Sequence, residues 1–161
     1  MLVPSSVMQS VSAFVAQNIG AGQKERAWRG FLTAIAAGCT AGVGIFFAGF
    51  FGGGALSSVF TSDSQVIVQS AAYLRGFSAE CILTCILFSS IGYFNGRGRS
   101  IPVMIQGITS AFLIRIPVSI FMSRLPGASL TLVGMATPIT TVYGIIFFVI
   151  CFLRLQFSAQ P

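Results

Sequence analysis

The sequence predicts an all-α, polytopic membrane protein with five transmembrane helices in a single domain of residues 1–161. Charged residues make up 7% of the chain, where soluble domains carry about 25%. Hydrophobic residues make up 55%, and the mean hydropathy is +0.89. Long runs such as 31–51 are apolar on every side, whereas the strands of a membrane β-barrel alternate in polarity over about ten residues. These observations favour helices in a lipid bilayer.

The same composition argues against enzyme, metal or nucleic-acid chemistry. The chain has no His and three acidic residues, too few for a metal site or for the paired acid and base of a hydrolase. All four cysteines lie within apolar segments, and we expect packing roles for Cys39, Cys81, Cys85 and Cys151. The net charge of +6 is explained by the orientation of the chain in the membrane and by attraction to anionic headgroups, so no nucleic-acid partner is expected.

The first predicted span, residues 2–19, is unusually polar. It contains Pro4, Gln9, Gln17 and four Ser, which is too polar for the apolar region of a signal peptide. Lipid offers no partner for such hydroxyl and amide groups. We therefore expect this segment to remain in the protein and to line an interior.

The second predicted span, residues 31–51, carries a row of small residues. Ala34, Gly38 and Gly42 recur at a spacing of four, which allows another helix to approach closely. The three glycines at 52–54 are expected to end the helix. We predict a packing role for the row.

The third to fifth spans are predicted at 66–94, 101–122 and 132–153. Residues 62–65 have the spacing of a capping box, which would begin a third helix of about 30 residues. The short link at 95–100 makes spans three and four an antiparallel hairpin. Pro117 and Pro138 each remove a backbone donor and are expected to bend spans four and five.

The distribution of basic residues predicts the orientation of the chain. Lys and Arg are concentrated in the loops of one side, which is expected to be cytoplasmic, and the other side has one, or two with Arg75. The C-terminus is then cytoplasmic and Met1 lies outside, in a multi-pass protein of the plasma or inner membrane. The six basic residues on the cytoplasmic side are Lys24, Arg26, Arg29, Arg97, Arg99 and Arg154.

Two ionisable residues fall inside the predicted spans. A charge at membrane depth costs at least about 2.5 kcal/mol, so Glu80 and Arg115 need partners or water. Each lies 15 residues from the link, about 22 Å at the helical rise, so the two side chains are expected to be able to meet. One interpretation is a structural ion pair. The other is a carboxylate that exchanges a proton or a cation, with Tyr73, Phe77 and Thr84 on the same helix face as the lining of an organic-cation cavity.

Four stretches of the sequence, in order, resemble the multidrug and toxic compound extrusion (MATE) transporters. Residues 12–21 with Pro4 and 25–27 resemble the eighth helix of that family, and 73–75 its tenth. Residues 92–96 resemble the loop behind the tenth helix, and 115–117 the eleventh helix. The motif positions singled out are Gln17, Asn18, Gly20, Asn95, Gly96 and Pro117.

The resemblance implies more than composition does. MATE transporters have twelve helices in two lobes of six, and they expel cationic or amphipathic compounds in exchange for protons or sodium as the coupling ion, and no cofactor is expected. Glu80 resembles an acid of the tenth helix that couples the cation. The chain resembles helices eight to twelve, a fragment whose expected partner is the N-terminal lobe of the same transporter.

Two alternatives remain at this stage. A related exporter or flippase of lipid-linked sugars would carry several cavity-facing cations, whereas this chain offers chiefly Arg115. A truncated remnant that does not transport is the other. The sequence leaves the substrate and the choice between proton and sodium open.

Overall fold

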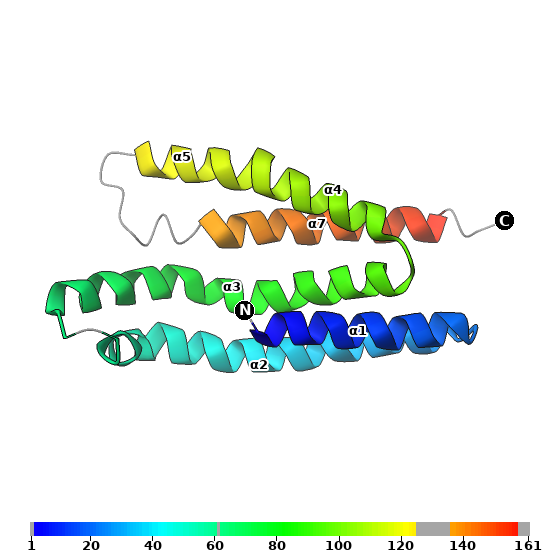
Figure 1. The fold of residues 1–161 in the computed structure, drawn as a ribbon, viewed down its shortest axis with the longest axis horizontal. Helices are drawn as coiled ribbons and strands as arrows, with labels where there is room; N and C mark the ends of the chain where they lie inside the picture. The colour runs from blue at the N-terminus through cyan, green and yellow to red at the C-terminus, as the bar shows by residue number, and fades with distance from the viewer. Residues whose placement is uncertain (1, 61, 125–135, 158–161) are drawn as a thin grey trace.

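A computed structural model describes residues 2–60, 62–124 and 136–157, and its regular elements there are all helices. A helix occupies each of the five predicted places, and the helices run side by side along one axis (Figure 1). In chain order they are α1 (Leu2–Gly20), α2 (Lys24–Ser58), α3 (Ser64–Gly96), α4 (Ser100–Thr109), the π-helix η1 (Ser110–Arg115), α5 (Ile116–Arg124) and α7 (Ala136–Phe157).

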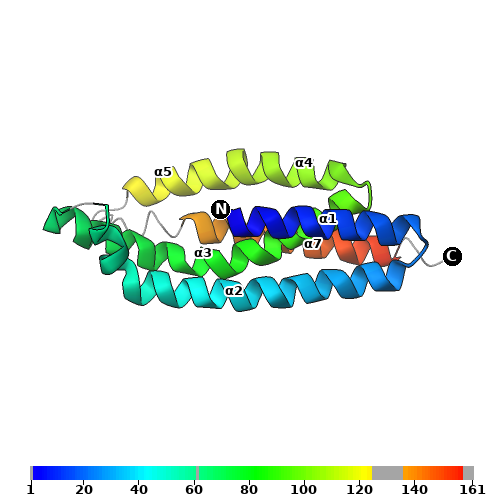
Figure 2. The ribbon, with the colours of Figure 1, turned by 60° about the horizontal axis from the view of Figure 1, so that its bottom comes forward.

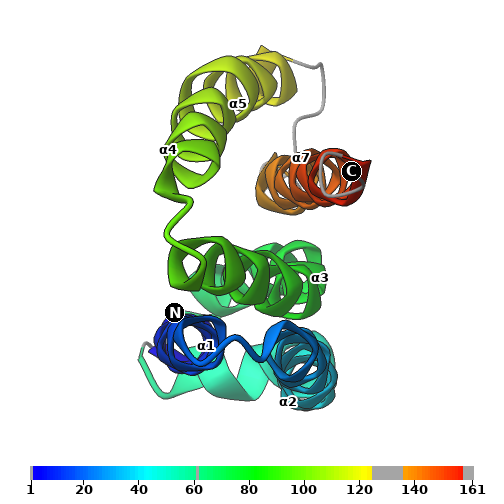
Figure 3. The same cartoon turned by 90° about the vertical axis from the view of Figure 1, so that its right-hand side faces the viewer.

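The helices form layers when the bundle is viewed end-on. In Figure 3, α1 and α2 lie together, α3 covers them, and α7 and the continuous rod of α4, η1 and α5 lie beyond α3. Figure 2 shows this rod, residues 100–124, along the edge opposite α2. We call residues 100–124 the arm. The arm runs antiparallel to α3, as the hairpin prediction required.

Three helical segments are long and apolar enough to cross a membrane: 24–58, 100–121 and 137–154. The two halves of α3 add a fourth if they count as one bent span. The polar α1 is outside this set. The sequence prediction of five helices is therefore confirmed, while the crossing of the membrane by α1 stays a prediction.

The ends of α2 differ from the prediction. The helix begins at Lys24, not at Phe31, and it continues to Ser58 through Gly52, Gly53 and Gly54, which were expected to end it. A helical glycine costs about 1 kcal/mol relative to alanine, an amount that packing can offset. Gly53 lies against Ala71 of α3, where an added Cβ would be 3.5 Å from the Ala71 Cα.

A capping side chain begins α3, and glycines with positive φ follow the ends of α1 and α3. Asp63, not Ser62, is the N-cap of α3, and its carboxylate accepts a hydrogen bond of 2.9 Å from the Gln65 amide. Gly22 follows α1 with φ of +74°, and Gly98 follows α3 with φ of +70°. Gly20 is the last helical residue of α1, and Gly22 lies in the turn just beyond it.

Small residues bring α2 and α1 close to α3. A Cβ at Gly38 would lie 3.1 Å from the Cys85 Cβ, and one at Gly42 would lie 3.0 Å from the Cys81 carbonyl oxygen. Gly92 meets α1 still more tightly, with the Met8 carbonyl oxygen 2.5 Å from such a Cβ. The prediction that the small row of α2 admits another helix is confirmed, and Cys85 is one of the buried residues it meets.

The two prolines were predicted to bend spans four and five, and the first of them lies just after a π-helix. Pro117 is the second residue after η1, and the amide of the intervening Ile116 bonds the Ala111 carbonyl five residues back. A widened π turn removes the clash between the proline ring and the preceding turn, so a π-helix takes the place of a simple bend. Pro138 is the third residue of the described part of α7, which begins at Ala136, so the bend predicted at this proline stays a prediction. Residues 132–135 of the predicted fifth span lie outside the described residues.

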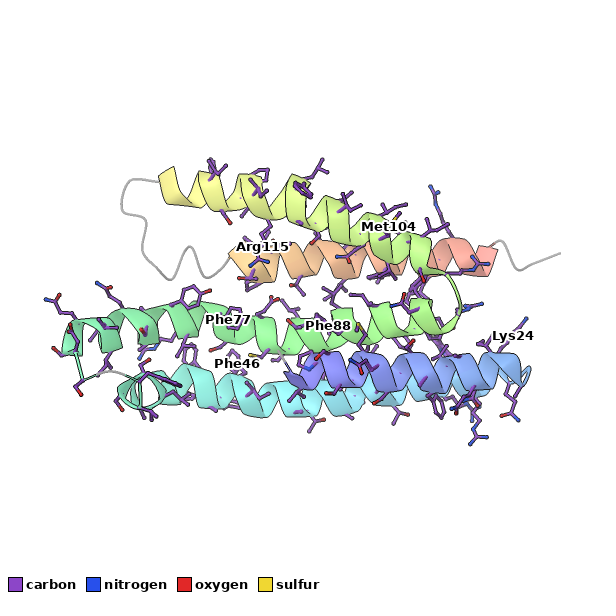
Figure 4. All side chains as sticks on the ribbon, viewed as in Figure 1. Lys24, Phe46, Phe77, Phe88, Met104 and Arg115 are labelled. Carbon is purple, nitrogen blue, oxygen red and sulfur yellow. The ribbon has the colours of Figure 1, made fainter. Side chains whose placement is uncertain are left out.

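Aromatic residues form the core at the end of the bundle where α2 begins and α7 ends. Phe94 and Phe148 are fully buried, with ring centroids 5.0 Å apart. All six basic residues assigned to one side lie at or near this end, where Figure 4 labels Lys24. We call it the basic end.

Candidate functional site: a buried carboxylate between helices

Glu80 lies in the middle of the bundle and is 4% exposed. Its Oε1 accepts hydrogen bonds from the Thr84 hydroxyl one turn further along α3, at 2.9 Å, and from the Thr141 hydroxyl of α7, at 2.7 Å. Two donors therefore hold one oxygen and fix the plane of the carboxylate.

The second carboxylate oxygen, Oε2, is buried and has no hydrogen-bond partner among the described residues. Glu80, Phe77 and Thr84 line a pocket of about 250 Å³ that also contacts Pro4 of α1 and Ile45 of α2. We call it the Glu80 pocket. An unpartnered carboxylate oxygen beside a mainly apolar pocket can accept a proton, a metal cation or the charged end of an organic cation.

A bend in α3 separates Tyr73 from this pocket. The helix turns by 48° between Arg75 and Glu80. Tyr73 stacks on Phe77 with ring centroids 6.1 Å apart, but it lines a different pocket with Val66 and Gln69. The structure thus brings Glu80, Phe77 and Thr84 together as predicted, and it leaves Tyr73 outside.

The predicted ion pair between Glu80 and Arg115 is wrong for the described residues, where the recorded ion pair joins Arg29 and Glu25 at the surface. Arg115 is exposed at the end of η1, and η1 packs on α7 and not on α3. Figure 4 shows Arg115 on the α7 side of the arm. The direct partner of Glu80 comes from α7, whose Thr141 takes the place predicted for Arg115.

Most of the motif positions lie toward the basic end and have structural contacts. The Asn18 side chain donates to the Phe14 carbonyl at 2.7 Å, and the Asn95 carbonyl accepts from the Gly98 amide at 2.9 Å. Gly96 packs on Val15 of α1. Gln17 and Gly20 are exposed, and Pro117 belongs to the arm.

The outward face of α1 is polar, and the expectation that α1 lines an interior stays a prediction. Gln9 and Gln17 are exposed on this face, and Ser6 and Ser10 line a groove with Ala34 of α2. Glutamine side chains facing acyl chains would leave their amides without partners. The face is suited to water or to another polar protein surface.

Sequence reasoning missed Thr141. A signal was present: Thr141 lies 13 residues before Arg154, about 20 Å at the helical rise, which is close to the depth calculated for Glu80. A second missed group is the Ser89 hydroxyl, whose oxygen is buried without a partner among the described residues.

Apolar helices packed around one buried acid define the chain as a polytopic helical membrane protein. The sequence model of the MatE family matches residues 1–121, which is most of the chain. The chain therefore belongs to the MatE family, whose members are transporters. No match was found among curated proteins or among solved structures.

Proposed function

We propose that this chain takes part in secondary active efflux, exchanging a proton or sodium ion for an organic cation at Glu80. The observation that carries the proposal is the unpartnered Oε2 of a buried carboxylate whose other oxygen is held by two threonines. A carboxylate in apolar surroundings must be neutralised, and a proton and a bound cation are competing ways to do so. Competition for one charge is the basis of exchange.

The dimensions of the Glu80 pocket support a limited role within a larger cavity. A pocket of about 250 Å³ is below the range of roughly 300–1,000 Å³ typical of drug-sized ligands. It suits an ion, or the charged end of a longer amphipathic molecule. The ring of Phe77 beside the carboxylate adds a second group that attracts positive charge.

The outer surfaces of the bundle support a second lobe as partner. The polar face of α1 needs a hydrated cavity or a protein surface opposite it. Rocking of two lobes around such a cavity would open Glu80 to alternate sides of the membrane. In this arrangement the basic end faces the cytoplasm of a plasma or inner membrane, as the excess of Lys and Arg there favours.

The test is ethidium efflux from cells that express the full-length transporter carrying this chain. Glu80→Gln removes the exchangeable charge and keeps the shape, so we expect loss of efflux driven by either a proton or a sodium gradient. Glu25→Gln is the matched control, because Glu25 is an exposed surface residue paired with Arg29. It should retain efflux at the wild-type level.

Protein yield and elution in size-exclusion chromatography separate a loss of transport from a loss of folding. Glu80→Gln should give folded protein, because a neutral amide oxygen still accepts from Thr84 and Thr141. Wild-type efflux by a folded Glu80→Gln variant would contradict the proposal.

A further inference from the structure

A second pocket, of about 620 Å³, lies between α2 and α3 at the end of the bundle opposite the basic end. There α2 and α3 extend beyond the described part of α7 (Figure 1). We call it the outer pocket. Three polar side chains, Ser57, Gln69 and Ser70, line it together with the rings of Phe60 and Tyr73. Both rings are exposed, and hydroxyl and amide groups on such an open wall are suited to water and to a hydrated ion.

The outer pocket and the Glu80 pocket follow one another along one face of α3. Lining residues of the two pockets recur at every third or fourth position, as they do on a single helix face. In chain order they are Val66, Ser70, Tyr73, Phe77, Cys81 and Thr84. Tyr73 belongs to the outer pocket and Phe77 to the Glu80 pocket, and their rings stack with planes 12° apart. The stacked pair therefore lies between the two pockets.

The bend of α3 lies at this pair. The Ser78 hydroxyl donates to the Leu74 carbonyl at 2.6 Å, and a serine that bonds the preceding turn in this way often bends a helix. Gly76 lies in the same stretch, and a glycine with a serine is a common cause of a sharp kink. A change in the bend angle would move Tyr73 relative to Phe77, so the stack can open where the helix bends.

Tyr73 also lies near the level at which the hydrocarbon is expected to end. It is 22 residues before Asn95, about 33 Å along α3, and the hydrocarbon of a bilayer is about 30 Å thick. Tyrosine rings favour this level. Glu80 is seven residues deeper, about 10 Å. The stacked pair is thus placed between a carboxylate at membrane depth and a pocket at the membrane surface.

We propose that the outer pocket is the route by which the coupling ion reaches Glu80 from the outer side, and that the stacked rings of Tyr73 and Phe77 close it in this structure. Beyond the rings, the unpartnered Oε2 of Glu80 is the acceptor that the ion meets. The inference rests on the proposed exchange at Glu80 and adds the path of the ion. The larger organic cation uses the cavity between the lobes.

The test measures access to Cys81, which lines the Glu80 pocket, and it requires no transport. The full-length transporter with Cys81 as its single cysteine is placed in right-side-out membrane vesicles. A cationic, membrane-impermeant methanethiosulfonate added outside forms a mixed disulfide with an accessible thiol and releases methanesulfinate. We expect slow labelling of this parent protein. Tyr73→Ala should be labelled about fivefold to tenfold faster, the factor that loss of one aromatic pair would give.

Three further variants separate the stack from general loosening of the protein. Tyr73→Phe keeps the stack and should be labelled as slowly as the parent. Phe60→Ala removes the other ring of the outer pocket and should also leave the rate unchanged. Phe77→Leu removes the second ring of the pair and should accelerate labelling, so the result does not depend on the folding of a single variant.

Equal labelling of the parent, Tyr73→Ala and Phe77→Leu would overturn the proposal. So would equal acceleration in Phe60→Ala, or acceleration confined to inside-out vesicles. None of these results bears on ethidium efflux by the Glu80→Gln variant, so the route and the proposed exchange can fail separately.

Discussion

The first three helices and the arm pack in opposite ways. Between α1, α2 and α3, glycines bring backbones together, and Val15 and Phe94 are completely buried. In the arm, Phe112 and Phe121 are 66% and 67% exposed, and η1 interrupts the α-helical pattern. The tight region fixes the position of Glu80, and the arm presents a large apolar surface to lipid or to another protein.

The largest loss of stability is expected when side-chain volume is added between α1, α2 and α3. In Gly92→Ala the new methyl group would meet the Met8 carbonyl oxygen, a backbone atom that cannot rotate away. We expect a loss of about 3 kcal/mol, or of folded yield altogether. The thermal unfolding midpoint of the detergent-solubilised variant, compared with that of the wild type, measures this loss.

The matched control for this prediction is Gly107→Ala in the arm, where nothing lies within 4 Å of an added Cβ. There we expect no loss and a gain of up to about 1 kcal/mol, because alanine is the better helix former. Similar losses at both positions would contradict the contrast between the two regions.

The second prediction concerns the link from α7 to the carboxylate. Thr141→Val preserves shape and removes the shorter hydrogen bond to Glu80, so we expect a loss of about 2 kcal/mol, typical of a bond to a charged or buried group. Thr33→Val is the control, since that exposed hydroxyl bonds only the Arg29 carbonyl of its own helix. If the unfolding midpoint fell equally in the two variants, the stabilising role assigned to the Thr141–Glu80 hydrogen bond would be contradicted.

A smaller and local effect is expected where the arm meets α7. The Tyr143 hydroxyl donates to Thr109 at 3.0 Å, and Tyr143→Phe removes this bond at a cost of about 1 kcal/mol. Hydrogen exchange should rise in the arm and stay unchanged in α1 to α3. A uniform rise across the bundle would mean that the two regions unfold as one unit.

The smallest effect concerns Arg115. Because no ion pair joins Arg115 and Glu80 among the described residues, a double-mutant cycle of Arg115→Gln and Glu80→Gln should give a coupling energy below about 1 kcal/mol. Unfolding free energies of the two single variants and the double variant supply the cycle. Coupling of about 2 kcal/mol or more would indicate a direct pair.

The helices and the depth of Glu80 could be predicted from the sequence, because apolar run lengths and a fixed rise per residue set both. The lateral neighbours could not. Gly144 of α7 packs against α3, where an added Cβ would lie 2.8 Å from the Leu87 Cδ1, and contacts of this kind place α7, and not η1, beside Glu80. Hydropathy carries no information on which helix surfaces pack together, and for this reason Arg115 was predicted as the partner of Glu80 and Thr141 was not.

The central claim, that Glu80 exchanges one positive charge for another, can be measured directly. Purified full-length transporter in weakly buffered, sodium-free solution is titrated with tetraphenylphosphonium while the pH is recorded. The account predicts release of about one proton per cation bound in the wild type, and none in Glu80→Gln. Equal proton release by both proteins, or tight binding without release in the wild type, would contradict it.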